Sequence, residues 1–267
     1  KGQVYCHLAA LTAWKESHAG FPCRITLLLE GEEEIGSPNL MAVVRGHAGL
    51  LKAAQVLIIS DSTQFAVGVP AITYGLRGLV YFQVHVRGAE SDLHSGVYGG
   101  AVANPATALV EALGGLHDDR GRVTVPGFYD AVQEVSEQEK EQWSRLPFDD
   151  ATFARELGVS KLYGEAGYGT LARKWSRPTL EIHGLTSGYQ GAGAKTVLPA
   201  EASAKISCRL VPDQEPRDIA VKVRRHILDL INKRYGDAVQ VTIEEVGPGA
   251  PPALTPVDSP EMTAAAN

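Results

Sequence analysis

The order of strand and helix patterns between residues 78 and 245 constrains the fold more than any other feature. Apolar side chains alternate along residues 80–86, as in a strand with one buried face. Apolar residues at 219, 223, 227 and 231 recur every four positions, which predicts an amphipathic helix that ends at Gly236. The predicted elements are strand 80–86, helix 104–115, strands 179–183 and 202–211, helix 219–231 and strand 239–243. This β-α-β-β-α-β order predicts an α+β domain of the ferredoxin-like type, with a hydrophilic, irregular insertion at about 116–177.

The residues before this domain show a different alternation. Two short apolar runs, 24–29 and 56–59, are typical of buried strands. A helical pattern precedes the first run, and a second one lies between the runs, beginning at the N-cap signal Ser37-Pro38. Helix, strand, helix, strand predicts an α/β unit with a parallel sheet. We therefore expect an α/β piece at 1–76, a second domain at 77–247 and a return segment at 248–267.

Composition and charge exclude several classes of partner. The chain is 44% hydrophobic and 21% charged, which is typical of a globular protein. Its net charge is −6 and it has no basic cluster, so neither nucleic acid nor a membrane is an expected partner. The 3 cysteines are an odd number without a CxxC pair, which disfavours a disulfide framework and indicates the cytoplasm.

An acidic loop follows the first predicted strand directly. Glu30, Glu32, Glu33 and Glu34 lie between glycines, ahead of the next helix. Ligands of open α/β sheets bind beyond the carboxyl ends of the strands, where one Glu can bind a metal ion while its neighbour acts as general base. Asp61 ends the next predicted strand and adds a hard oxygen donor suited to a divalent cation. A solvated acidic loop, and a turn or N-cap role for Asp61, are the alternatives.

Two more candidates lie in the second domain. His94 stands in a glycine-rich loop, Asp92–Gly100, where it can donate a hydrogen bond to an oxyanion or simply be exposed. Arg209 faces away from Ile206, Cys208 and Leu210 on its strand, and can hold a substrate carboxylate or merely face solvent. The loop at 191–196 lacks the glycine before Lys195 that a phosphate loop requires, which excludes nucleotide binding there.

Six segments, taken in order, resemble the M20 family of metallopeptidases. The details at 74–78 and 97–100 are most similar to its dipeptidase branch, which includes carnosinase-like enzymes. The resemblance implies a partial zinc-peptidase-like catalytic domain with an inserted ferredoxin-like lid, which is also the dimerisation domain. The segments are 30–37, 60–61, 72–78, 92–100, 194–199 and 206–212.

The resemblance also implies a role for each matching residue. Glu33 matches the general base, Glu34 a metal ligand, and Asp61 the ligand of the other metal. His94 matches the lid histidine that reaches the partner subunit's active site and polarises the scissile carbonyl. The remaining implied roles are substrate contacts: Arg209 with the terminal carboxylate, and Thr196 as a second contact.

The family pattern includes metal ligands that this sequence does not contain. The resemblance places a His-x-Asp segment and a bridging Asp before Lys1, and a final His after Asn267. We therefore expect a fragment that holds metal poorly and is inactive alone. For the complete protein we expect a homodimeric dipeptidase with two divalent metal ions, zinc or manganese, acting on short peptides with a free C-terminus. An N-acyl-amino-acid deacylase of the same family and a non-catalytic dimerising module are the alternatives.

Overall fold

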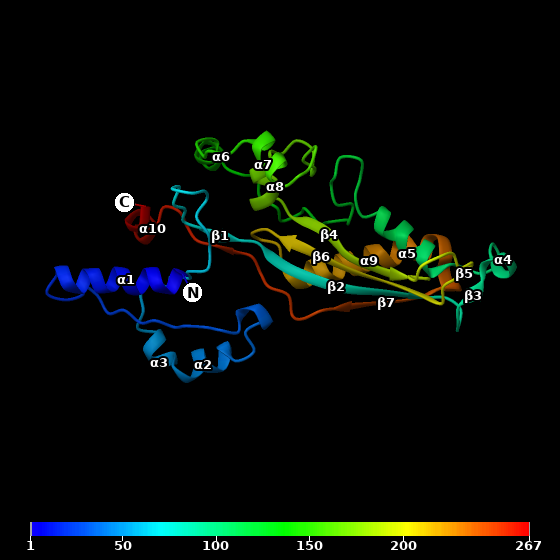
Figure 1. Ribbon diagram of the computed structural model, residues 1–267, viewed down its shortest axis with the longest axis horizontal. Coiled ribbons are helices and arrows are strands. Elements are labelled where there is room, and N and C mark those ends of the chain that lie inside the picture. The colour runs from blue at the N-terminus through cyan, green and yellow to red at the C-terminus, as the bar shows by residue number, and fades with distance from the viewer. Residues whose placement is uncertain (1, 267) are drawn as a thin grey trace. The chain divides into compact units, whose positions relative to one another are not determined.

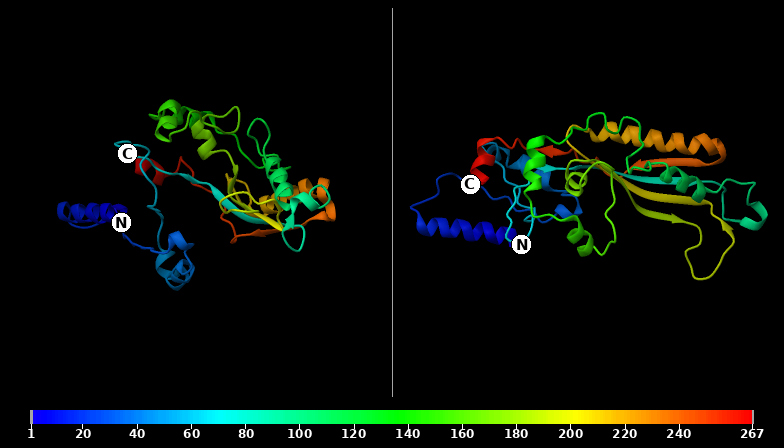
Figure 2. Two further views of the ribbon diagram at one scale, coloured as in Figure 1. Left: turned by 45° about the vertical axis from the view of Figure 1, so that its right-hand side comes forward. Right: turned by 90° about the horizontal axis from the view of Figure 1, so that it is seen from above.

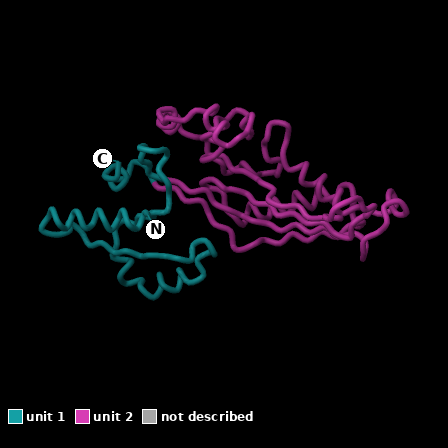
Figure 3. The backbone as a smooth tube through the Cα atoms, viewed as in Figure 1, with its two compact units in different colours: residues 1–73, 256–267 teal, residues 74–255 magenta. Residues whose placement is uncertain are grey.

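The computed structural model describes residues 2–266, and these form two compact units (Figure 3). Unit 1 comprises residues 1–73 and 256–267, and unit 2 comprises residues 74–255. No helix among residues 2–266 is both long and apolar enough to cross a bilayer. The chain is a mixed α/β protein, as the sequence predicts.

Unit 2 is built on a four-stranded antiparallel sheet with the order β4-β6-β2-β7 (Figure 1). Helices α5 and α9 follow β2 and β6 along the chain and pack against the sheet. This is the predicted ferredoxin-like arrangement. The bounds are β2 Gly78–Arg87, α5 Pro105–Gly114, β4 Thr179–Ser187, β6 Glu201–Leu210, α9 Pro216–Tyr235 and β7 Gln240–Glu245.

The core lies between this sheet and the two helices. Alternate residues of β2 are buried, with Phe82 and Val84 fully covered. The predicted apolar stripe of α9 faces them, and Ile227 is also fully covered. Asn104 caps α5, because its side-chain oxygen accepts from the N–H of Ala106 at 2.9 Å. The patterns at 80–86, 104–115 and 219–231 are confirmed.

The segment predicted to be an irregular insertion is more ordered than expected. Its first part contributes Leu116, Val123 and Phe128 to the core. The rest contains three short helices: α6 Glu137–Ser144, α7 Asp150–Glu156 and α8 Thr170–Trp175. Local polar side chains set the starts of α6 and α7: Ser136 forms a capping box with Glu139 on α6, and the Asp149 carboxylate accepts from the N–H of Thr152 on α7.

Unit 2 begins and ends on neighbouring strands. Strand β1 (Gly75–Leu76) pairs antiparallel with β8 (Ala253–Leu254). The stretch 247–252 is tied back to the start of β2, because Leu79 and Ala250 exchange two backbone hydrogen bonds of 2.8 Å. The chain passes from one compact unit to the other between residues 73 and 74 and between residues 255 and 256.

Unit 1 contains helices but not the predicted parallel sheet within the part of the chain that the structure describes. The runs 24–29 and 56–59 are extended but are not assigned to strands. Leu29 is 67% exposed and Leu57 is 83% exposed. Neither run has a hydrogen-bonded neighbouring strand, and apolar composition alone does not supply one. The helices are α1 Gly2–Ser17, η1 Glu33–Ile35, α2 Leu40–Gly46, α3 Ala48–Leu51 and α10 Pro260–Ala266, and Figure 2 gives two further views of the chain.

The helix predicted from Ser37 onward starts later and breaks once. Ser37 has a φ of 53°, outside the conformation of an N-cap, and its N–H closes a turn onto Glu32. Asn39 takes the N-cap position instead, but its amide donates to the Glu32 carboxylate rather than capping the helix. His47 separates α2 from α3. The predicted Ser37 cap is therefore wrong.

Candidate functional site

His94 and Thr196 lie side by side in unit 2, although the sequence separates them widely. Strand β3 (Leu93–His94) pairs antiparallel with β5 (Val197–Leu198), so that His94 lies opposite Val197. The His94 Nε2 atom is 3.3 Å from the Thr196 Oγ1 atom. Two of the residues predicted for the site are thus brought into direct contact.

Two further hydrogen bonds hold the loops that carry this pair. The N–H of Ser95 donates to the carbonyl of Thr196 at 3.1 Å. The N–H of Ala200 donates to the carboxylate of Asp92 at 2.9 Å. Asp92 therefore joins the two loops from the other end of the β3–β5 pair, although sequence reasoning gave it no role. Both residues of this pair are exposed.

Arg209 lies on the exposed side of β6, as its alternation with Cys208 and Leu210 predicts. A second arginine, Arg77, stands near it, just before β2. Burial, and secondarily the positive charge of Arg209, lower the pKa of the Arg77 guanidinium below its ordinary value. Two neighbouring guanidinium groups favour an anionic ligand. Sequence reasoning missed Arg77, and its place directly before a strand was the available signal.

Glu33 and Glu34 lie in unit 1, on the single turn η1, and are exposed. The turn is closed by Gly36 in the left-handed conformation, with a φ of 87°. Glu32 has a structural role: its carboxylate accepts a hydrogen bond from the side-chain amide of Asn39 at 3.0 Å, which ties the loop to the start of α2. The acidic loop thus has one anchored carboxylate, Glu32, and three exposed ones, Glu30, Glu33 and Glu34.

Asp61 is exposed on a segment that α1 holds on both sides. The His7 Nε2 atom is 2.8 Å from the hydroxyl of Ser60, and the amide of Gln3 donates to the carbonyl of Ser62 at 2.9 Å. The Asp61 carboxylate is therefore carried on an irregular segment that these bonds position, rather than at the end of a strand. Sequence reasoning placed it on a strand because of the apolar run before it.

The carboxylates of unit 1 are the right kind of donor for a divalent metal, but the described residues do not complete a metal centre. Glu34 and Asp61 offer hard oxygen atoms. Among residues 2–266, no group of three or more His, Cys, Asp or Glu side chains comes together in a way that could hold a metal ion. The donors present therefore do not fit a complete metal site by themselves.

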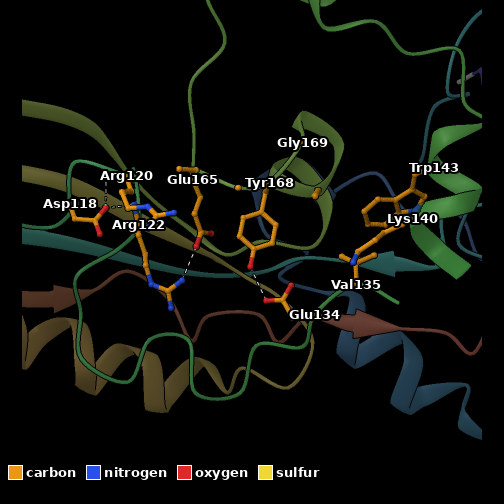
Figure 4. Close-up of a pocket in the computed structure, with 13 residues that line it drawn as sticks. Asp118, Arg120, Arg122, Glu134, Val135, Lys140, Trp143, Glu165, Tyr168 and Gly169 are labelled. Carbon is orange, nitrogen blue, oxygen red and sulfur yellow. Dashed lines mark hydrogen bonds and ion pairs between the residues drawn. The ribbon is translucent and has the colours of Figure 1, made fainter. Parts of the chain in front are cut away.

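A separate hollow lies among residues 118–172, where sequence reasoning expected no site (Figure 4). Its volume is about 740 Å³, and its lining mixes cations and anions. Glu165 anchors one wall by accepting from Arg122 at 2.9 Å, and Tyr168 donates to Glu134 at 2.8 Å. Three cationic and three acidic side chains line it, so the hollow has no net preference for either sign of ligand; they are Arg120, Arg122, Lys140, Asp118, Glu134 and Glu165.

Comparison with known families identifies one domain. The peptidase dimerisation domain of M20 peptidases matches residues 74–234, most of unit 2. The matched stretch contains His94, Thr196 and Arg209.

Curated relatives match a larger part of the chain. The Cys-Gly metallodipeptidase dug1 of Schizosaccharomyces pombe is 34% identical over 87% of this chain and 49% of its own length. The Beta-Ala-His dipeptidase of Homo sapiens is 33% identical over 92% of this chain and 49% of its own length. The chain thus spans about half the length of the curated relatives it matches.

Solved structures of dipeptidases are also similar to most of this chain. The dipeptidase Dug1p of Saccharomyces cerevisiae superposes with a TM-score of 0.76 at 30% identity, over 88% of this chain and 49% of that one. Human carnosine dipeptidase 1 gives a TM-score of 0.75 at 32% identity, over 88% and 50% of the two chains.

Proposed function

The chain belongs to the M20 peptidase family, and we propose that the protein carrying it is a metal-dependent dipeptidase. The observation that carries the proposal is the match to named dipeptidases along 87% and 92% of this chain. The contact of His94 with Thr196, and the two arginines at one end of the central strands β2 and β6, support it independently.

The substrate we propose is a short peptide with a free C-terminal carboxylate. Arg209 offers a planar pair of N–H donors, the geometry that carboxylates accept. Arg77 adds a second positive charge nearby. Thr196 lies beside His94 at the opposite end of the β2–β6 pair, so its hydroxyl would reach the substrate bound by the other subunit of the proposed homodimer. Fixing the carboxylate positions the scissile amide at a set distance from it, which selects short substrates.

In the proposed reaction Glu33 is the general base and His94 stabilises the oxyanion. Glu33 takes a proton from the attacking water at a carboxylate oxygen and passes it to the leaving amine. His94, from the other subunit of the proposed homodimer, donates a hydrogen bond to the carbonyl oxygen as negative charge develops there. Divalent metal ions, when bound, acidify water and polarise carbonyls. We assign Glu34 and Asp61 as two of the metal ligands, and zinc or manganese as the metal.

The assignment of Glu33 is tested by its conservative variant. In the active enzyme, Glu33→Gln should abolish dipeptide hydrolysis while the metal content, measured by mass spectrometry, stays unchanged. Glu16→Gln, on an exposed position of α1, is the matched control and should retain full activity. Normal turnover by Glu33→Gln would refute its role as the base.

A substrate panel that pairs dipeptides with N-acyl amino acids separates the dipeptidase proposal from the deacylase alternative.

We propose that unit 2 mediates a homodimer and that the enzyme acts in the cytoplasm. The match of residues 74–234 to a dimerisation domain supports the first proposal. The free and exposed thiols of Cys6 and Cys23 support a reducing compartment. Light scattering coupled to gel filtration tests the first proposal, since a monomer at micromolar concentration would contradict it.

A further inference from the structure

We infer that Gly96 is a positioning residue whose backbone N–H holds His94 in the tautomer with its proton on Nε2. The N–H of Gly96 points at the His94 Nδ1 atom at 3.0 Å. A backbone N–H can only donate, so Nδ1 must be the ring nitrogen with the free lone pair. In the neutral imidazole the proton then lies on Nε2.

The hydrogen bond from Gly96 to the His94 ring also depends on the absence of a side chain at Gly96. A Cβ atom added there would lie 2.9 Å from Cε1 and 3.1 Å from Nδ1 of His94. Any side chain would therefore push away the ring that the Gly96 N–H has to reach. The φ angle of Gly96 lies outside the left-handed region, so backbone strain does not explain the glycine.

The contact at the second ring nitrogen, Nε2, is compatible with this tautomer. Nε2 is 3.3 Å from the Thr196 hydroxyl oxygen, and with its proton in place it donates to that oxygen. The Thr196 hydroxyl then directs its own hydrogen elsewhere. In this geometry the free donor is the Thr196 hydroxyl. The Nε2–H of His94 becomes a donor to an anionic or developing anionic oxygen when it exchanges the long 3.3 Å contact with Thr196 for that oxygen.

The consequence for catalysis rests on the proposed function. With Nδ1 occupied by the backbone, His94 acts at Nε2 as a donor and not as a base. A donor to a developing oxyanion lowers the barrier more than it strengthens substrate binding, so its loss lowers kcat and leaves KM nearly unchanged. Gly96 acts only through His94 and should show the same split.

The tautomer can be measured without any activity. The 267-residue chain labelled with ¹⁵N-histidine would be studied by long-range ¹H–¹⁵N correlation spectroscopy, which separates the two nitrogen types of each ring. The spectrum of the variant His94→Gln identifies the signals of His94 among the 8 histidines. We expect a pyrrole-type Nε2 and a pyridine-type Nδ1. The reverse pattern, or an averaged one, would overturn the inference from the unmodified chain alone.

The variant Gly96→Ala tests whether the Gly96 N–H fixes the tautomer of His94. It should release the ring and average the two nitrogen signals, and in the active enzyme lower kcat by up to about 10²-fold with little change in KM. The matched control is Gly114→Ala at the end of α5, where an added Cβ meets nothing within 4 Å. Unchanged His94 signals in Gly96→Ala would refute its role. An enzyme without dipeptidase activity would refute the proposed function only, since the tautomer is read independently.

Discussion

Replacing Glu165 with alanine should strongly destabilise unit 2, because it leaves a buried arginine without its counter-ion. The Glu165 side chain is 9% exposed and the Arg177 side chain is 4% exposed. Nε and Nη2 of Arg177 each donate to a Glu165 carboxylate oxygen at 2.8 Å. Arg122 donates to the same carboxylate at 2.9 Å, but its side chain is 46% exposed and can return to water.

The remaining contacts of Arg177 compensate only in part. Glu134 is 3.4 Å away and 67% exposed, so solvent screens it. The Tyr168 ring lies 4.1 Å from the guanidinium carbon, a cation–π contact of about 1 kcal/mol. Removing one partner of a buried pair costs about 3–5 kcal/mol, and these contacts place the expected loss near 3 kcal/mol. For a domain of this size that corresponds to about 6–12 °C in Tm.

Urea and thermal unfolding followed by circular dichroism measure this loss. The control is Glu141→Ala, which breaks a pair with Arg145 in which the side chains are 66% and 72% exposed, and it should cost at most about 0.5 kcal/mol. The double variant Glu165→Leu with Arg177→Met should recover stability relative to Glu165→Ala, because no unpaired charge stays buried. Equal losses for Glu165→Ala and Glu141→Ala would refute the reasoning.

Three further predictions concern the core, a titrating group and a helix cap. Ile227→Ala, at a fully buried position, should cost about 2–5 kcal/mol in urea unfolding, whereas Val221→Ala, 64% exposed on the same helix, should cost almost nothing. Burial lowers the pKa of His226 below its ordinary value, so its stabilising effect is complete above pH 6.5 and is lost as the pH falls through the folded-state value. His226→Gln should flatten that slope in unfolding titrations between about pH 7.5 and pH 5, and an unchanged slope would contradict the assignment. Asn104→Ala should cost about 1 kcal/mol of unfolding free energy by removing the bond from Ala106, and Asn104→Ser should restore it; a loss that serine does not restore would argue against capping.

Elements with purely local signals were predictable from the sequence. The four-residue spacing of α9 and its end at Gly236, the Asn104 cap of α5 and the alternation of β2 each depend on neighbouring residues only. The sheet order followed from the order of the elements, because the split β-α-β arrangement admits few topologies.

Features that depend on distant partners were not predictable. An apolar run at 24–29 or 56–59 indicates that burial is favourable, but a strand also needs a neighbour to complete its hydrogen bonds. The Ser37 signal failed because Glu32, on the preceding turn, competes for the backbone N–H of Ser37 and for the amide of Asn39.

The same distinction applies to the candidate site. His94 and Thr196 were each identified by motif, but their contact spans 102 positions and depends on the short pairing of β3 with β5. The role of Asp92 in that frame and the position of Arg77 beside Arg209 are also long-range features. The roles assigned to all the candidate site residues stay predictions, for Glu33, Glu34 and Asp61 as for His94, Thr196 and Arg209.

The pairing of β1 with β8 makes unit 2 a module with a single point of attachment. Gly75 lies opposite Leu254, so the chain leaves unit 1 and returns to it through adjacent backbones. Once unit 2 has folded, the long chain segment between residues 73 and 256 acts, for the folding of unit 1, as a short closed loop. By the logarithmic law for loop closure, this spares the folding of unit 1 roughly 3 kcal/mol of chain entropy. The same geometry makes residues 74–255 a natural unit for excision or transplantation, since joining its ends or grafting it into another loop requires almost no change in span.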